Sequence, residues 1–235
     1  MVKSGIGLFV NVSISFLVFA FISFSLVSVN VSAAGNGRFF DVEAYPLTLD
    51  AACREGVAKL YDECGSQVDI VNAAMTAAAA KDKTVLVVYG AEWCVWCFVF
   101  DSYIQGEYRE HYYEWARDQE LEKWVMTQKS NEGAKPDARR LNQFVAENFV
   151  IAHIEGDKAP DGADAINALG LNASDINFYP FIASLSKTGA YAGHMFGYEV
   201  MKNSEDRKDR EGRKLKSFDR TLLLERLNQL KNQAN

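Results

Sequence analysis

The feature that most constrains the fold of this chain is a pair of cysteines, Cys94 and Cys97, that follows a run of apolar residues. Residues 85–89 read Val-Leu-Val-Val-Tyr, which is typical of a buried strand, and Gly90 ends it. The residues after Cys97 have helical character. At the start of a helix, free backbone N–H groups and the helix dipole stabilise the thiolate of the first cysteine. The second cysteine lies one turn further on, where it can attack a mixed disulfide formed by the first. The spacing and its setting therefore predict redox chemistry.

Other uses of the two cysteines fit the sequence less well. A zinc site needs four ligands, and the sequence has no second C-x-x-C and no nearby histidine pair. Covalent haem attachment needs a histidine after Cys97, where Phe98 stands. A structural disulfide remains as the alternative, and the strand-to-helix setting beside Trp93 favours a redox pair. We expect no metal and no organic cofactor.

The N-terminal residues predict export from the cytoplasm. Residues 1–34 are interpreted as a signal peptide or a membrane anchor, because Lys3 precedes an apolar run over about residues 6–29. Ser32-Ala33-Ala34 fits a cleavage site, whereas the length of the run also fits an uncleaved anchor. In both cases the folded part is expected outside the cytoplasm, in a bacterial periplasm, either soluble after cleavage or anchored. Disulfides form and persist there. The formal charge of −6, without a basic stripe, argues against binding to nucleic acid.

The order of apolar runs and turn signals predicts an α/β fold, with a central mixed sheet covered by helices on both faces. Residues 35–67 are expected to form a linker and an N-terminal helical extension, and residues 68–235 the main domain. Charged and aromatic residues at helical spacing predict a helical insertion over about residues 107–140. Residues 202–216 are interpreted as a solvated loop. The other expected helices cover about 68–81, the residues after Cys97, 139–148, 163–169 and 218–230, and the expected strands cover 84–89, 149–154, 181–185 and 191–196.

Together these residues resemble the thioredoxin-like superfamily, and within it exported thiol–disulfide interchange proteins. The resemblance covers about residues 68–230, and the segments that carry it are 85–89, 91–97, 148–150, Tyr179-Pro180 and 187–189. It implies a thioredoxin fold and exchange with protein thiols and disulfides, in which Cys94 is the nucleophile and Cys97 the resolving thiol. It also implies that Pro180 is cis and faces the cysteines. A membrane or soluble redox partner would recharge the pair.

Three departures from that family bear on the mechanism. Thioredoxins carry a buried acid six positions before the first cysteine, where this chain has Val88. The proton acceptor for Cys97 is therefore open between water and another carboxylate. The dipeptide between the cysteines is Val95-Trp96, which tunes the redox potential differently from glycine-proline. The insertion around residues 107–140 has no counterpart. Its aromatic residues are expected to form the buried face of a helix pair or, alternatively, a docking surface for a partner.

Further candidate residues surround the motif. Trp93, Trp96, Tyr179 and Pro180 are predicted to border a groove that binds an extended substrate segment. Glu92 is interpreted as a solvated neighbour of the motif, with modulation of the thiol as the alternative. Of the three histidines, His153 lies on a strand between apolar residues, which favours a packed side chain over a catalytic one.

The second pair of cysteines, Cys53 and Cys64, is harder to interpret. Export favours a structural disulfide between them. A continuous helix over these residues, however, would separate their Cα atoms by roughly 16 Å, and a disulfide needs less than about 7 Å. Either the segment bends or each cysteine has another fate, such as an intermolecular link or a buried free thiol.

Two functions follow from these patterns. The first is an exported thiol–disulfide oxidoreductase that exchanges disulfides with protein substrates through Cys94 and Cys97. The alternative is a redox-inert binding or chaperone-like module that has kept the fold, a reading motivated by Val88 and by the unmatched insertion.

Overall fold

The computed structural model describes residues 39–50, 53, 58–118, 123–209 and 212–235. The predicted leader, residues 1–34, lies outside them. Within the described residues, none of the helices combines the length and the apolar character that a membrane span requires.

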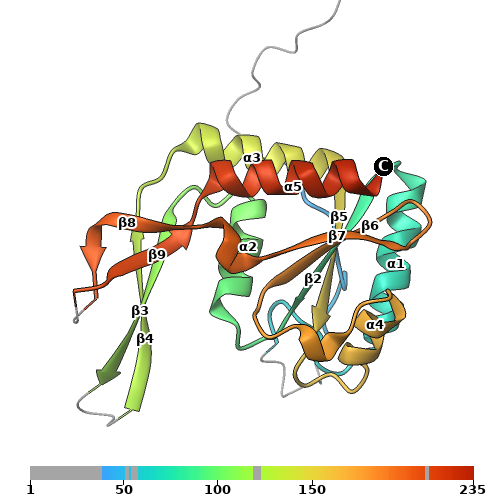
Figure 1. Ribbon diagram of the computed structural model, residues 1–235, viewed down its shortest axis with the longest axis horizontal. Coiled ribbons are helices and arrows are strands. Elements are labelled where there is room, and N and C mark those ends of the chain that lie inside the picture. The colour runs from blue at the N-terminus through green and yellow to red at the C-terminus, as the bar shows by residue number, and fades with distance from the viewer. Residues whose placement is uncertain (1–38, 51–52, 54–57, 119–122, 210–211) are drawn as a thin grey trace, which may run out of the picture. The chain divides into compact units, whose positions relative to one another are not determined.

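A five-stranded mixed sheet forms the centre of the fold, with the strand order β1-β5-β2-β6-β7 (Figure 1). Its strands are β1 (Ala44–Tyr45), β2 (Thr84–Gly90), β5 (Phe149–Glu155), β6 (Phe181–Leu185) and β7 (Tyr191–Phe196). The apolar run before the cysteines becomes β2, which pairs with β5 in parallel and with β6 antiparallel. All seven residues of β2 are buried, because helices cover both faces of the sheet.

Alternate side chains of β2 enter two separate cores. Leu86 and Val88 pack with α2 (Val95–Ile104), α3 (Lys135–Asn148) and α5 (Arg220–Ala234). Val85 and Val87 pack on the other face with α1 (Gln67–Ala80) and α4 (Gly162–Ala168). The predicted α/β architecture, a central mixed sheet with helices on both faces, is confirmed, and it is consistent with a thioredoxin fold. The short edge strand β1, within the predicted linker, was not expected.

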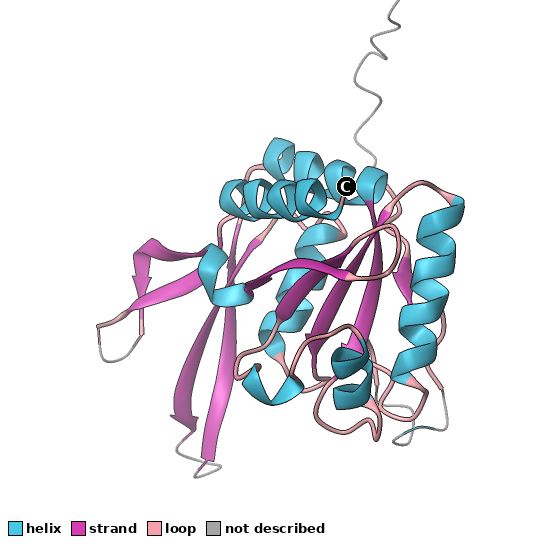
Figure 2. Cartoon of the chain, turned by 45° about the vertical axis from the view of Figure 1, so that its right-hand side comes forward, coloured by secondary structure: helices cyan, strands magenta, loops and turns pink. Residues whose placement is uncertain are grey.

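The predicted helical insertion is wrong. The strands β3 (Glu110–Asp118) and β4 (Lys123–Asn131) pair antiparallel as a hairpin, which Figure 2 shows as a long ribbon beside the central sheet. Tyrosine and tryptophan favour strands, and each strand here gains nine cross-strand partners. This pairing outweighs the helical spacing of the aromatic residues.

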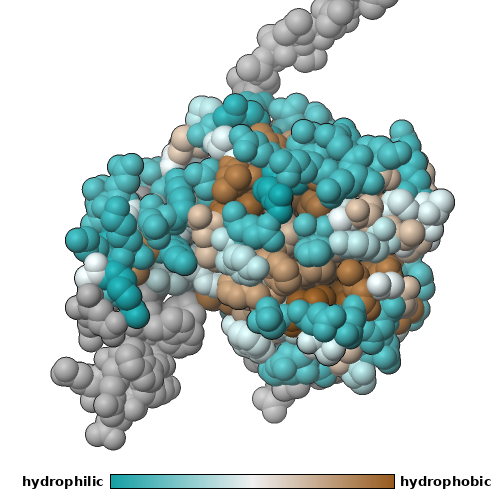
Figure 3. All heavy atoms as spheres, viewed as in Figure 1, coloured by the Kyte–Doolittle hydropathy of each residue, from teal (hydrophilic) through white to brown (hydrophobic). Residues whose placement is uncertain are grey.

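The predicted solvated loop over residues 202–216 is also wrong. It forms a second hairpin of β8 (Met201–Lys208) and β9 (Lys214–Phe218), which contacts β3. Both faces of β8 are largely polar, so alternation gives little signal for it. On the face of the molecule in Figure 3, hydrophobic residues gather over the central sheet, whereas the part that holds β8 and β9 is mainly hydrophilic.

The N-terminal extension is not a continuous helix. Residues 58–65 run as a loop without helical turns, and Cys53 and Cys64 form a disulfide with their Cα atoms 5.8 Å apart. The two Cα atoms are therefore much closer than the roughly 16 Å that a continuous helix would impose, and the disulfide can form.

Candidate active site

The two motif cysteines lie at the N-terminus of α2 and form a disulfide. Cys94 is the N-cap residue of the helix, and its Sγ accepts a hydrogen bond from the backbone N–H of Cys97 at 3.2 Å. The same N–H stabilises negative charge on Sγ when the pair is reduced, as does the helix dipole. Cys94 is 4% exposed and Cys97 is fully buried. An incoming thiol or disulfide therefore reaches Cys94 first.

A mainly apolar groove of about 650 Å³ runs along Cys94. The lining residues come from the motif and from the loop before β6, and they are Trp93, Cys94, Val95, Trp96, Ile176, Asn177, Phe178 and Tyr179. The structure thus brings together three of the four residues predicted to bind substrate. Trp93 is 62% exposed, and its indole N–H donates to Asp157 at 2.9 Å. An apolar groove beside a disulfide is suited to an extended, apolar segment of another protein.

Pro180, the fourth residue predicted to bind substrate, does not line this groove. The Tyr179–Pro180 peptide bond is cis, in agreement with the sequence-based expectation, but Pro180 is buried and packs close to Gly197. Tyr179 is the residue of this pair that contacts the site. Its ring centroid lies 6.0 Å from that of Trp93 and 5.3 Å from that of Tyr89. Burial is the main cause that raises the pKa of Tyr179, so its hydroxyl stays neutral.

Trp96, between the two cysteines, is held by both hairpins. Its ring packs edge-on against Tyr113 of β3 and against Phe218 at the end of β9, with the ring centroids 5.3 Å and 5.5 Å apart. The hairpin that replaces the predicted helical insertion therefore supports one wall of the groove. Through this contact the β3–β4 hairpin is part of the structure around the cysteine pair.

Glu92, two residues before Cys94, is not a solvated neighbour as expected. Its carboxylate accepts three backbone N–H groups in a row, from Lys59 at 2.7 Å, Leu60 at 3.0 Å and Tyr61 at 2.9 Å. Hydrogen bonds to a charged acceptor are stronger than neutral ones. Glu92 therefore fixes the loop before α1 against the cysteine motif.

That loop places Tyr61 directly behind the cysteines. Tyr61 is fully buried and packs with Ala91, Cys94 and Cys97. Its ring meets the imidazole of His153 edge-on, with the ring centroids 5.5 Å apart.

His153 is paired with an acid. Its Nε2 lies 3.3 Å from Oδ1 of Asp101, an ion pair when the imidazole is protonated. His153 is 2% exposed, so the expectation of a packed side chain is confirmed, although a carboxylate packs against it as well as apolar groups.

A second buried carboxylate, Glu155, ends β5 beside Gly90. Its oxygens accept backbone N–H groups from Glu92 at 2.8 Å, Asp157 at 2.9 Å and Lys158 at 3.1 Å. Burial raises the pKa of Glu155, whereas these three hydrogen bonds lower it, and the net direction is upward. Glu155 therefore orders the loop after β5.

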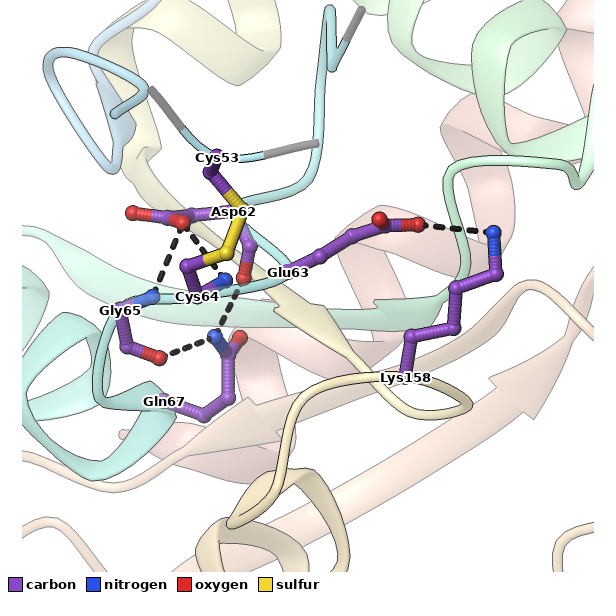
Figure 4. Close-up of a disulfide and its surroundings, with 7 residues drawn as sticks. All are labelled: Cys53, Asp62, Glu63, Cys64, Gly65, Gln67 and Lys158. Carbon is purple, nitrogen blue, oxygen red and sulfur yellow. Dashed lines mark hydrogen bonds and ion pairs between the residues drawn. A yellow bond between two sulfur atoms is a disulfide. The ribbon is translucent and has the colours of Figure 1, made fainter. Parts of the chain in front are cut away.

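The Cys53–Cys64 disulfide is embedded in a separate network of hydrogen bonds (Figure 4). The carboxylate of Asp62 accepts the N–H groups of Cys64 and Gly65, both at 2.9 Å. The side-chain amide of Gln67 donates to the carbonyl oxygens of Asp62 at 2.7 Å and Gly65 at 2.9 Å. Beside it, Lys158 pairs with Glu63 at 3.1 Å. This network fixes the turn that carries Cys64.

Reasoning from the sequence missed Tyr61 and Asp101 as parts of the site. One signal was available, since Asp101 follows Cys97 by four residues and therefore lies on the same face of a helix. Tyr61 carried no such signal, because its position depends on a loop that folds back over the motif.

Comparison with known proteins gives little further information. No family model matches the chain, and no curated protein matches it either. Among solved structures, the chain is similar to a disulphide isomerase from Xylella fastidiosa Temecula1, at 18% identity and a TM-score of 0.37. The match covers 57% of this chain and 77% of that one. A likeness this distant assigns no activity, which must come from the chain's own residues.

Proposed function

We propose that this protein is an exported thiol–disulfide oxidoreductase that exchanges disulfides with protein substrates through Cys94 and Cys97. The observation that carries the proposal is the position of the disulfide, at a helix N-terminus and on the wall of an apolar groove. A structural disulfide has no need of such a groove. The apolar N-terminal run and a second disulfide support export, since disulfides persist outside the cytoplasm.

The reaction needs no cofactor. In the reducing direction, the Cys94 thiolate attacks one sulfur of a substrate disulfide, and the other sulfur leaves as a thiolate. Cys97 then loses its proton and attacks Cys94 Sγ, which closes the Cys94–Cys97 disulfide and releases the second substrate sulfur. The protein gives up two electrons and the substrate gains them. In the opposite direction, a substrate dithiol opens the disulfide that the structure contains.

Turnover of insulin and of glutathione disulfide tests the proposal. We expect activity in the parent protein and none in Cys94→Ser, because serine has no thiolate to form the mixed disulfide. Ser186→Ala, a small substitution at a half-buried position after β6 and far along the chain from the motif, serves as the control and should retain activity. Equal turnover in the parent and in Cys94→Ser would overturn the proposal.

Equilibration with glutathione buffers, followed by mass spectrometry of trapped thiols, then determines the direction. A potential of about −270 mV, near that of thioredoxin, indicates a reductase that needs an electron supply, and one of about −120 mV indicates a disulfide donor. A Cys94–Cys97 disulfide that resists every buffer would favour the redox-inert binding module instead.

A further inference from the structure

We propose that Tyr61, His153 and Asp101 form a buried acid–base relay that takes the proton from Cys97 when this thiol attacks the mixed disulfide. The inference rests on the proposed function and assigns one step of it. That step is the deprotonation of Cys97, for which thioredoxins use a buried acid on the strand where this chain has Val88.

Cys97 needs a proton acceptor because it has no direct contact with solvent. Its side chain is fully buried, and burial in apolar surroundings favours the neutral thiol over the thiolate. The thiolate is the form that attacks a disulfide. Val88, two residues before the end of β2, offers only aliphatic carbon. The proton must therefore pass to another side chain.

The hydroxyl of Tyr61 is well placed for this transfer. A β-carbon built on Gly90 would lie 2.5 Å from Sγ of Cys97 and 2.6 Å from the Tyr61 hydroxyl oxygen. The two atoms are therefore at most about 5 Å apart, on the same side of β2. The absence of a side chain on Gly90 leaves the space in which they approach each other.

His153 and Asp101 lie on the same face of the sheet. His153 pairs in register with Val88, and its neighbours Ile151 and Phe149 at alternate positions of β5 pack in the core beneath α2. Asp101 follows Cys97 by one turn of α2 and reaches His153 Nε2 at 3.3 Å. The imidazole of His153 therefore lies on the neighbouring strand, beside the position at which thioredoxins carry their buried acid.

The polar atoms of this cluster are unusual. Tyr61 Oη, His153 Nε2 and Asp101 Oδ1 are buried, and none has a hydrogen-bond partner of good geometry among the described residues. Buried polar groups are normally paired, and an unpaired group calls for an explanation, of which a catalytic role is one. Three such atoms behind one buried thiol are explained at once if a proton moves among them.

Tyr61 passes the proton on and does not keep it. Burial raises the pKa of Tyr61 well above its ordinary value, and neighbouring carboxylates raise it further, so the phenol stays neutral. The groups that face Tyr61 are Asp101 on α2, Glu155 and His153 on β5, Glu92 before the motif, and Tyr179 before β6. In the proposed step, Cys97 gives its proton to the Tyr61 oxygen while Tyr61 releases its own toward His153.

The step balances. The Cys97 S–H bond breaks, Cys97 sulfur bonds to Cys94 Sγ, and the bond from Cys94 to the substrate sulfur breaks with its electron pair. The substrate leaves as a thiolate. The proton ends on the imidazole of His153, where the carboxylate of Asp101 stabilises the positive charge. In the reverse direction the imidazolium returns the proton to Cys97.

Glu155 is the competing acceptor in the same region, and its hydrogen bonds argue against it. Both of its oxygens accept backbone N–H groups, three in all, which hold the carboxylate in place and favour its charged form. Burial nevertheless raises the pKa of Glu155, so Glu155→Gln is measured beside the variants of the relay.

The reaction of the reduced protein with the aromatic disulfide DTNB isolates the step. Cys94 attacks first, at a rate proportional to the DTNB concentration, and releases one thionitrobenzoate. Cys97 then releases the second in a phase that is independent of that concentration. Stopped-flow absorbance resolves the two phases, and mass spectrometry of trapped thiols verifies that Cys53 and Cys64 remain paired.

We expect His153→Gln to slow the second phase at pH 7 by about 100-fold, in the range of general acid–base catalysis, and to shift the midpoint of its pH profile upward. Asp101→Asn and Tyr61→Phe should slow it in the same direction, with the first phase unchanged within a factor of about two. Tyr61→Phe keeps the ring that packs on His153, so it preserves the test if His153→Gln does not fold. His194→Gln, an exposed histidine on β7, and Tyr103→Phe, a buried tyrosine on α2, are the matched controls.

Two outcomes would overturn the relay. One is a second phase whose pH profile is unchanged in both His153→Gln and Tyr61→Phe. The other is a loss of the second phase in Glu155→Gln alone. A parent protein that releases no second thionitrobenzoate would instead contradict the proposed function.

Discussion

The two disulfides of this chain differ in the length of chain that they close and in the structure around them. Cys94–Cys97 spans three residues, begins a helix and borders an apolar groove. Cys53–Cys64 spans eleven residues, and its flanking backbone groups are bound by Asp62 and Gln67. Cys94 lies on a groove that can hold a substrate segment, whereas Cys64, although exposed, lies in a turn that hydrogen bonds fix.

The Cys53–Cys64 disulfide also supports the site of the Cys94–Cys97 pair. The loop that Cys53–Cys64 closes carries Tyr61, and Glu92 from the cysteine motif binds three N–H groups of the same loop. Tyr61 is thus fixed from both sides against Cys97. The Cys53–Cys64 disulfide thus stabilises the loop that packs behind the Cys94–Cys97 pair, and the positions of the two disulfides are coupled.

Removal of the structural disulfide should have the largest effect on stability. In the chain-entropy view, closing a loop of about twelve residues contributes about 3 kcal/mol, so Cys53→Ala/Cys64→Ala should lower the free energy of unfolding by that amount. Cys94→Ala/Cys97→Ala closes a much shorter loop and should lower it by about 2 kcal/mol or less. Urea titrations of both variants measure the difference. A larger loss in the Cys94/Cys97 variant would reverse the assignment of roles.

Truncation of Glu92 tests the coupling between the two regions. Three N–H groups lose a charged acceptor in Glu92→Ala, which should cost about 2 kcal/mol, since part of the site is open to water. Glu225→Ala, an exposed glutamate on α5, should change stability by less than about 0.5 kcal/mol. Urea titration gives both values. Equal and small effects would mean that the loop is held by the disulfide alone.

Much of the exchanging region could be predicted from sequence because its signals are local. The β-branched run of β2, the glycine that ends it and the C-x-x-C spacing all lie within thirteen residues. Burial of a strand and the start of a helix follow from residue types alone. The apolar groove, too, was indicated by Trp93, Trp96 and Tyr179, although Pro180 does not line it.

The region of the structural disulfide could not be predicted in the same way, because tertiary contacts decide it. Nothing local indicates that residues 58–65 form a loop held by Glu92, more than thirty positions away. The two hairpins present the same problem. Tyr112 and Trp115 fit a helix by spacing, and only pairing with β4 and contact with β9 make them part of a strand.

The two tryptophans of the motif should separate binding from stability. Trp96→Ala removes ring contacts with Tyr113 and Phe218 and should lower the free energy of unfolding by about 1.5 kcal/mol, less than for a fully buried aromatic residue. Trp93, mostly exposed, should cost less than about 0.5 kcal/mol, yet its loss should weaken binding of an unfolded protein substrate trapped as a mixed disulfide on a Cys97→Ala background. Urea titration and substrate affinity, measured on both variants, are the readouts. Similar stability losses in both would mean that the hairpins do not support Trp96.

The smallest expected effect concerns Glu155, which joins the two regions by accepting the N–H of Glu92 while its own N–H donates to Gln67. Because burial raises its pKa in the folded protein, Glu155 contributes stability that is fully present below its unfolded pKa, about 4.5, and is lost as the pH rises through the folded value. The parent should therefore lose stability relative to Glu155→Gln as the pH rises from about 4 to 7. The change should be small, since three backbone hydrogen bonds offset much of the cost of burial. Urea titrations at several pH values give the two curves. A parent that gains on Glu155→Gln over this range would mean that the hydrogen bonds outweigh burial, and that the back wall of the exchange site is held by a fully charged carboxylate.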